Sequence, residues 1–142
     1  MAKRTSTWVK DIHEMHEKFG VHEWLAFKQF DQEYNVLNQF LAFRINFLEE
    51  ELNETREAFV NKDAEEIIDG LIDMCVIAIG TLDILGVDAD HAWRQVHAAN
   101  MAKEPGVKAS RPNPFGLPDL IKPANWQGPD HKGNHGDTAD FL

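Results

Sequence analysis

The chain of 142 residues has little of several features that mark common classes of protein. Its single cysteine, Cys75, cannot form an intrachain disulfide and lacks the ligand spacing of a zinc site, so we expect a small core residue there. The N-terminal MAKRTSTWVK has no apolar h-region, which argues against a signal peptide. The longest apolar run, Met74–Ile79, is too short to cross a bilayer. These absences predict a cytoplasmic protein without a membrane partner.

Positive charge is also scarce. The net charge is −10, and all of it comes from residues 1–104, where twenty acidic residues face ten basic ones. Nucleic-acid binding needs a basic surface, so we expect no nucleic-acid partner. A substrate that carries phosphate is compatible with this charge only if metal ions mediate the contact. The length and the hydrophobic content of 43% are those of a single globular domain.

Proline is confined to one segment: all six prolines lie in residues 105–129, and there are no repeats and no β pattern. Before this segment the apolar residues recur at helical spacing. The predicted fold is therefore all-α, a four- to five-helix bundle with an irregular Pro-rich C-terminal arm. Residues 1–104 would form one helical domain, residues 105–130 an extended arm on the body or on a neighbouring subunit, and residues 131–142 a disordered tail.

The expected helices have recognisable ends. Thr5, Ser6 or Thr7 can cap the first, which ends at Gly20. Others are expected at about 34–61, 64–85 and 89–103, while residues 21–34 are ambiguous. The aromatic residues there form either core or an apolar wall for a nucleobase, with core favoured: Trp24, Phe27 and Phe30.

Two further patterns concern helix packing and histidine. Gly70 and Gly80 reduce helix propensity inside an apolar helix, which indicates close approach of another helix. His13 and His16 lack the i, i+4 spacing of a zinc protease, so we expect surface or interface residues there.

Acidic residues occupy unusual positions in residues 47–73. On a helical wheel, Glu51 and Glu54 lie at the edge of an apolar stripe. Glu66, Asp69 and Asp73 share one face of the following helix, which is otherwise apolar on nearly every side. A turn near residues 61–63 would bring the two sets face to face.

Grouped carboxylates are unfavourable unless positive charge compensates them. Only four basic residues lie between positions 40 and 100. Mg²⁺ prefers oxygen ligands, and Mn²⁺ can replace it, so the pattern favours a metal site. The alternative is a solvated acidic face that pairs with lysine and arginine.

The motif EELNE (residues 50–54), then EIID (66–69) and VHAANMAKE (96–104), resembles the MazG-like all-α nucleoside triphosphate pyrophosphohydrolases. The likeness is to small phage and bacterial members, including relatives of phosphoribosyl-ATP pyrophosphohydrolase, over about residues 10–130. It implies Mg²⁺ ligands at Glu51, Glu54, Glu66 and Asp69. The apolar run that follows the second motif in the family here follows Asp73, so Asp73 is a ligand candidate instead of Asp69 or beside it.

The resemblance also implies other roles. Glu50 and Glu51 would be catalytic, with Glu50 positioning water or acting as general base. Asn100 and Lys103 would contact the substrate, Lys103 at phosphate. Further phosphate candidates are weaker: Arg44 and Lys122.

The implied activity is Mg²⁺-dependent hydrolysis of an NTP or dNTP to the monophosphate and pyrophosphate, in a homodimer or homotetramer. Alternatives within the class are a phosphoribosyl-ATP pyrophosphohydrolase or a pyrophosphatase narrow for dUTP or dGTP. An alternative of another class is a non-catalytic acidic helical module that binds a partner. A di-iron bundle is strongly disfavoured because the sequence contains no Glu-x-x-His.

Overall fold

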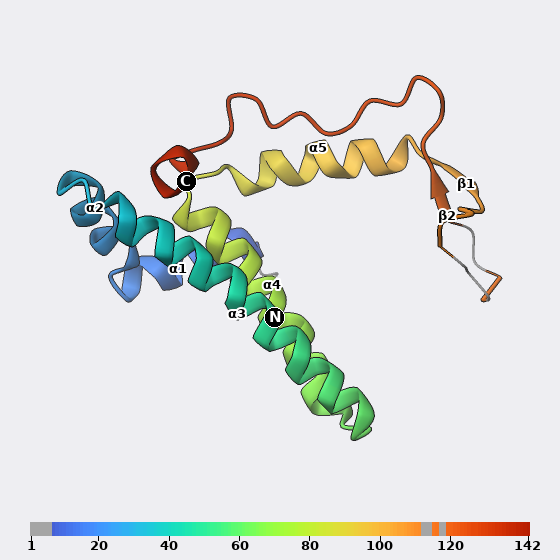
Figure 1. Ribbon diagram of the computed structural model, residues 1–142, viewed down its shortest axis with the longest axis horizontal. Helices are drawn as coiled ribbons and strands as arrows, with labels where there is room; N and C mark the ends of the chain where they lie inside the picture. The colour runs from blue at the N-terminus through green and yellow to red at the C-terminus, as the bar shows by residue number, and fades with distance from the viewer. Residues whose placement is uncertain (1–6, 112–114, 117–118) are drawn as a thin grey trace, which may run out of the picture. The chain divides into compact units, whose positions relative to one another are not determined.

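A computed structural model describes residues 7–111, 115–116 and 119–142 of the protein. The described residues form mainly α-helices, with one two-stranded hairpin and a short 3₁₀ helix (Figure 1). The helices are α1 (Trp8–Lys18), α2 (Val21–Phe30), α3 (Tyr34–Val60), α4 (Ala64–Ile84), α5 (Ala89–Met101) and η1 (Thr138–Phe141), and the strands are β1 (Glu104–Gly106) and β2 (Asp119–Ile121). The all-α class is confirmed, and the hairpin is an addition to it.

The chain divides into two compact units. The first contains Met1–Ala89 and His135–Leu142, and the second contains Asp90–Asn134. The division thus follows the first residue of α5, whereas the sequence placed a boundary at residue 104. Among the described residues no single helix is long and apolar enough to cross a membrane; α4 and α5 reach the required length and hydropathy only when counted together across the break between them.

The first helix begins and ends as the sequence predicts. The Thr7 hydroxyl accepts the N–H of Lys10 at 3.2 Å, so Thr7 is the N-cap, while the alternatives Thr5 and Ser6 lie outside the described residues. Gly20 follows with a φ of +74°, a left-handed conformation that suits glycine. It lets the chain turn directly into α2.

The ambiguous stretch is therefore helical, but only one of its three aromatic residues reaches the core. The Trp24 ring packs against Phe40 with 4.8 Å between ring centroids. Phe27 and Phe30 are 60% and 85% exposed. The core prediction is wrong for these two residues, because their side of α2 has nothing packed over it within the described part of the chain.

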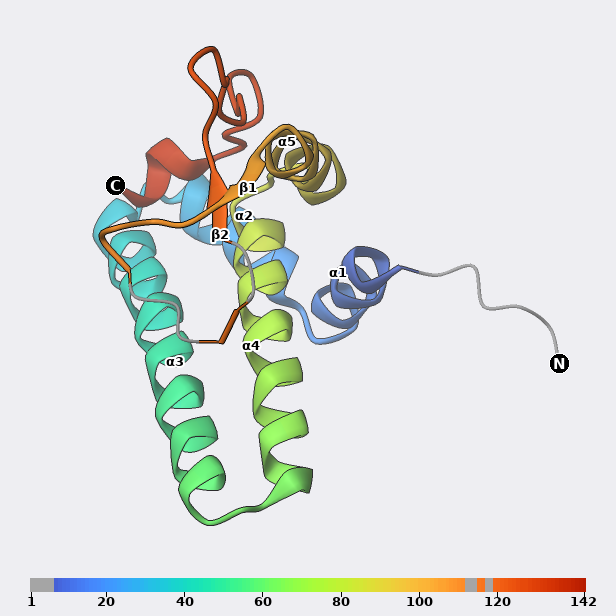
Figure 2. The same ribbon diagram turned by 90° about the vertical axis from the view of Figure 1, so that its right-hand side faces the viewer.

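Helices α3 and α4 form an antiparallel hairpin, joined by the predicted turn (Figure 2). Lys62 takes a left-handed φ of +57° there, and the Asp63 carboxylate caps α4 by accepting the N–H of Glu66. The close approach predicted at both glycines is confirmed. A Cβ at Gly70 would lie 2.2 Å from the Thr55 hydroxyl oxygen, and one at Gly80 would lie 2.7 Å from a guanidinium nitrogen of α3.

The core of the first unit lies at the open end of this hairpin. It contains Leu25, Leu37, Ile84, Leu85 and Phe141. Phe141 is fully buried although it is the penultimate residue. The Asn38 side-chain amide donates to its carbonyl at 3.0 Å. The prediction of disorder to the C-terminus is therefore wrong for the last residues, which an aromatic anchor and backbone hydrogen bonds hold in place.

Helix α4 is less buried than its apolar sequence predicts. Ile68, Leu71 and Ile72 are 63%, 51% and 45% exposed, and Phe59 at the end of α3 is 74% exposed. Within one chain, α1, α2 and α3 cover only part of α4, so a helix that is apolar all round keeps an uncovered side.

The second unit contains α5 and the β1–β2 hairpin. The strands pair antiparallel, with Pro105 opposite Leu120, in the segment expected to be irregular. Asp119 on β2 accepts from the Arg111 guanidinium at 2.9 Å and from the Lys108 N–H at 3.3 Å. These two hydrogen bonds lower the pKa of the Asp119 carboxyl below its usual value. Polar contacts thus hold together a hairpin that has little apolar content.

Candidate functional site

The predicted carboxylates lie where α3 and α4 run side by side. Thr55 of α3 packs against Gly70 of α4, which sets these two residues at the same level. Because the helices are antiparallel, a residue that follows Gly70 on α4 lies level with a residue that precedes Thr55 on α3 (Figure 2). With a rise of about 1.5 Å per residue, Asp73 is nearly level with Glu51, and Asp69 is about one turn closer to the connecting turn. The register therefore sets the acidic residues of the two helices beside each other.

Glu51 is the centre of this acidic cluster, which we define as Glu50, Glu51, Glu54, Asp69 and Asp73. The pKa of the half-buried Glu51 carboxyl is raised by desolvation and by the negative charges of the four other members. Repulsion from both helices acts on one group, so these carboxylates are close enough to interact. Positive charge placed among them would relieve it.

Glu66 occupies a different position. It lies in the first turn of α4, exposed, about 4.5 Å along the helix axis before Asp69. Its charge is not among the largest causes that raise the pKa of Glu51. The register thus favours Asp69 and Asp73 over Glu66 as partners of Glu51.

The carboxylate oxygens are not gathered tightly. Among the described residues, no three carboxylates of α3 and α4 have oxygen atoms all within 4.8 Å of one another. Glu50, Glu54 and Asp69 are exposed and free to extend into water. Like charges that face water extend away from one another, so the ligand assignments remain predictions.

Arg44, the phosphate candidate on α3, makes contacts within the hairpin. Its Nε donates to the Thr81 hydroxyl at 3.1 Å, and an Nη donates to the Ile77 carbonyl at 3.0 Å. Burial lowers the pKa of its guanidinium below the usual value. Two of its donors are thus committed to α4, which gives Arg44 a structural role whether or not it also meets phosphate.

The remaining substrate candidates belong to the second unit. Asn100 lies exposed on α5. The ammonium groups of Lys103 and Lys122 lie 5.4 and 4.9 Å from the centroid of the same Trp126 ring. The indole N–H donates to the Ala99 carbonyl at 2.7 Å, which fixes the ring against α5. Two predicted phosphate residues, distant in sequence, therefore converge on one aromatic side chain.

Sequence reasoning missed a second polar cluster, formed by His13, His16, His22 and Asp83. The three imidazoles contact the Asp83 carboxylate at 2.6 to 2.7 Å. His16 is only 5% exposed, so its prediction as a surface or interface residue is wrong within this chain, whereas His13 is exposed. One feature of the sequence could have revealed this cluster. It is an aspartate in the second half of an apolar helix, together with three histidines on the first two helices.

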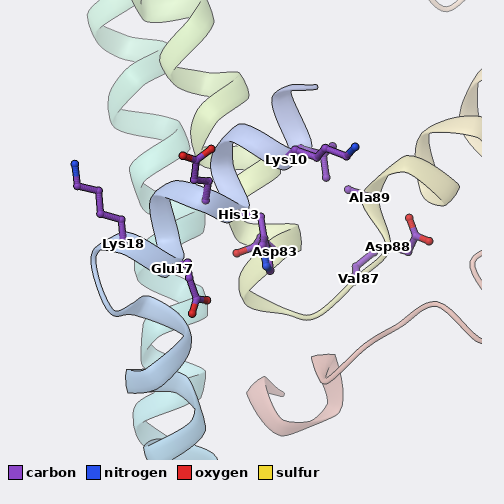
Figure 3. A pocket seen from close by; sticks show the side chains of 10 residues that line it. Lys10, His13, Glu17, Lys18, Asp83, Val87, Asp88 and Ala89 are labelled. Carbon is purple, nitrogen blue, oxygen red and sulfur yellow. The ribbon is translucent and has the colours of Figure 1, made fainter. Parts of the chain in front are cut away.

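Opposing effects set the charges in this histidine–aspartate cluster. Burial disfavours the charged form of His22, but hydrogen bonds to Glu17 and Asp83 outweigh it and raise its pKa. Burial would likewise raise the pKa of Asp83, but hydrogen bonds from the three histidines outweigh it and lower the pKa. His13, Glu17 and Asp83 also line an open pocket of about 670 Å³ (Figure 3).

Comparison with known proteins gives one family. Residues 23–100, more than half of the chain, match the phosphoribosyl-ATP pyrophosphohydrolase family. The chain belongs to this family. It is thereby a member of the MazG-like all-α NTP pyrophosphohydrolase superfamily, as its motifs predict. No curated protein matches the chain. Membership supports a hydrolase and suggests pyrophosphohydrolase activity on phosphoribosyl-ATP or related nucleoside triphosphates.

Proposed function

We propose that the protein is a Mg²⁺-dependent nucleoside triphosphate pyrophosphohydrolase, which converts an NTP or dNTP to the monophosphate and pyrophosphate. The observation that carries the proposal is the register of the α3–α4 hairpin, which sets carboxylates of both helices near Glu51; desolvation and their negative charges raise the pKa of Glu51. A family of pyrophosphohydrolases covers the same residues. Charge repulsion between two packed helices disfavours folding, whereas a bound cation would offset it.

The donor set fits the proposed ion. All members of the acidic cluster offer carboxylate oxygens, and Mg²⁺ or Mn²⁺ accepts a few carboxylates together with water and substrate phosphates. Glu51, Glu54, Asp69 and Asp73 would hold the ions, with Glu66 as a further ligand. When bound, the ions would neutralise phosphate charge and lower the pKa of water.

The chain's own residues would divide the remaining work. Glu50 would accept the proton of the attacking water as general base, since it is exposed and adjacent to Glu51. Lys103 would pair with a phosphate, and Asn100 would hydrogen-bond the substrate. Lys122 shares the Trp126 ring with Lys103 and would add positive charge there. Arg44, already bound to α4, would hold the hairpin in register.

The proposal includes a homodimer or homotetramer. The uncovered apolar side chains of α3 and α4 support it, because a helix that is apolar all round needs a further surface against it. A second copy of the chain would supply that surface. The proposed location is the cytoplasm.

Two other functions have support. The family description makes phosphoribosyl-ATP a candidate substrate, and dUTP or dGTP would represent a narrow preference within the same chemistry. A non-catalytic acidic module that binds a partner would explain the net charge but not why carboxylates of two adjacent helices lie close enough to repel one another.

A substrate panel distinguishes these functions. Release of pyrophosphate from ribo- and deoxynucleoside triphosphates and from phosphoribosyl-ATP would be followed with Mg²⁺, with Mn²⁺ and with EDTA. We expect metal-dependent release together with the matching monophosphate, and the preferred compound identifies the substrate class. A panel that is inactive throughout would overturn the enzyme in favour of the binding module.

Substitutions locate the site. Asp69→Asn and Asp73→Asn each replace a proposed carboxylate ligand by a neutral amide, so we expect activity to fall by more than about a hundredfold, beyond the usual loss of an outer-shell partner. The metal-free protein should become more stable, because repulsion on Glu51 falls. Glu57→Gln, an exposed residue of α3 outside the cluster, is the matched control. Unchanged activity in both variants, with Glu57→Gln also active, would remove these residues from the site.

A further inference from the structure

Three histidines from two helices surround a single carboxylate in the first unit. The Asp83 Oδ2 atom lies 2.7 Å from both His16 Nδ1 and His22 Nε2, and its Oδ1 atom lies 2.6 Å from His13 Nδ1. The His16 and Asp83 side chains are only 6% and 12% exposed. The ligand atoms of His16, His22 and Asp83 all lie within 4.8 Å of one another, which is close enough to share one ion.

The position of His22 is that of a prepared metal ligand. Its Nδ1 atom contacts a Glu17 carboxylate oxygen at 2.5 Å, while its Nε2 atom faces Asp83. A carboxylate that binds the outer ring nitrogen of a histidine fixes the orientation of the ring and raises its basicity toward a metal. A simple surface ion pair would not need both nitrogens of one ring to be held by acidic side chains from different elements.

This histidine–aspartate cluster is separate from the acidic cluster. Asp83 follows Asp73 by ten residues on α4, or about 15 Å along the helix axis. Its donors also differ, because imidazole nitrogen suits zinc, copper, nickel and iron, whereas Mg²⁺ prefers oxygen. A cation that suits the donor atoms of one site is therefore not expected to prefer the other site.

We propose that His16, His22 and Asp83 form a binding site for a first-row transition-metal ion of the Zn²⁺ class, with the fourth position left to water. In a tetrahedral zinc site, bonds of about 2.0–2.2 Å place neighbouring ligand atoms roughly 3.3 Å apart. The present contacts of 2.6 to 2.7 Å need to open by less than about 1 Å. His13, whose side chain is 63% exposed, lies at the wall of the pocket and contacts the other oxygen of Asp83, which orients this carboxylate.

The bound ion would have a defined structural effect. It would tie α1 and α2 to the last turns of α4, at a place where Gly80 leaves room for the His16 ring. Because the unfolded chain holds no such site, binding adds to the stability of the folded state. The site does not depend on the nucleotide chemistry proposed above, so it can be tested without any substrate.

The direct test uses the full-length protein with Zn²⁺ and, separately, Co²⁺, both in excess Mg²⁺ to occupy the acidic cluster. We expect one Zn²⁺ per chain at saturation and a Co²⁺ spectrum with the strong visible bands of tetrahedral coordination. In NMR spectra, one equivalent of Zn²⁺ should shift the ring resonances of His16 and His22 but not those of His97. Weak octahedral Co²⁺ bands and unshifted rings would overturn the proposal without any variant.

Variants assign the ligands. His22→Gln and Asp83→Asn should each weaken Zn²⁺ binding by more than about tenfold, the lower limit for loss of an outer-shell partner. His97→Gln, an exposed histidine of α5, and Asp69→Asn, in the acidic cluster, should leave Zn²⁺ affinity unchanged. Circular dichroism verifies that each variant keeps its helices. Equal Zn²⁺ affinity in His22→Gln and His97→Gln would mean that the cluster is only a hydrogen-bonded network.

Discussion

Gly70, which has no side chain, sets the distance between the two helices that carry the acidic cluster. Gly70 lets Thr55 approach so closely that any Cβ would collide with its hydroxyl, which itself donates to the Glu51 carbonyl at 2.7 Å. The same contact fixes the register that places Asp73 level with Glu51. Gly70 is therefore needed both for the packing of α3 on α4 and for the arrangement of the proposed metal ligands.

We predict that Gly70→Ala destabilises the protein only while Thr55 keeps its hydroxyl. Overpacking costs about 1–3 kcal/mol, whereas replacing glycine by alanine in a helix gains about 1 kcal/mol. The free energy of unfolding, measured in urea, should fall for Gly70→Ala in the wild-type chain. In a Thr55→Ala background the same change should be neutral or stabilising. Additive effects of the two substitutions would contradict the contact.

At the scale of single residues, the sequence predicts helix packing better than it predicts polar contacts. Close approach at Gly70 and Gly80 follows from two glycines in an apolar helix, because glycine there costs helix propensity. The contacts of His16 do not follow, since its partner Asp83 is 67 residues away in sequence. Spacing along one helix cannot reveal a ligand set that forms only when three helices pack.

At the scale of elements, helices α1, α3, α4 and α5 were predictable, whereas the 3₁₀ helix η1 was not. The expected ranges 34–61 and 64–85 differ from α3 and α4 by one residue at their C-terminal ends, because apolar periodicity and the turn near residues 61–63 mark them. The four-residue η1 is too short to show a period. Its position depends on Phe141, whose burial depends on the cavity between other helices.

We predict that the C-terminal anchor matters for stability far more than its position suggests. Phe141 is fully buried beside Leu37, so Phe141→Ala should lower the free energy of unfolding by about 3–5 kcal/mol. Leu142 is 83% exposed, and Leu142→Ala should stay within about 0.5 kcal/mol of the wild type. Urea denaturation of the two variants measures the difference. Equal stabilities would show that the end of the chain does not belong to the core.

At the scale of the whole molecule, composition and motifs predicted the class and family but not the division into units. The boundary expected at residue 104 followed from where proline begins, yet the division follows Ala89, at the start of α5. Proline content marks where helices stop, whereas units are defined by which segments pack together. The return of His135–Leu142 to the first unit depends on the same packing.

The last prediction concerns the oligomeric state and rests on the exposed apolar side chains of α4. We expect sedimentation equilibrium to give at least twice the chain mass of 16.2 kDa, because exposed apolar side chains of α3 and α4 would be covered by another copy. Ile68→Glu would place an uncompensated carboxylate in that interface, at a cost of several kcal/mol, and should reduce the mass to that of one chain. Glu65→Gln, on the same helix and already polar, should leave the mass unchanged. If Ile68→Glu assembles like the wild type, the interface between copies does not include this side of α4. If it dissociates and also stops releasing pyrophosphate, the proposed nucleotide pocket needs both copies.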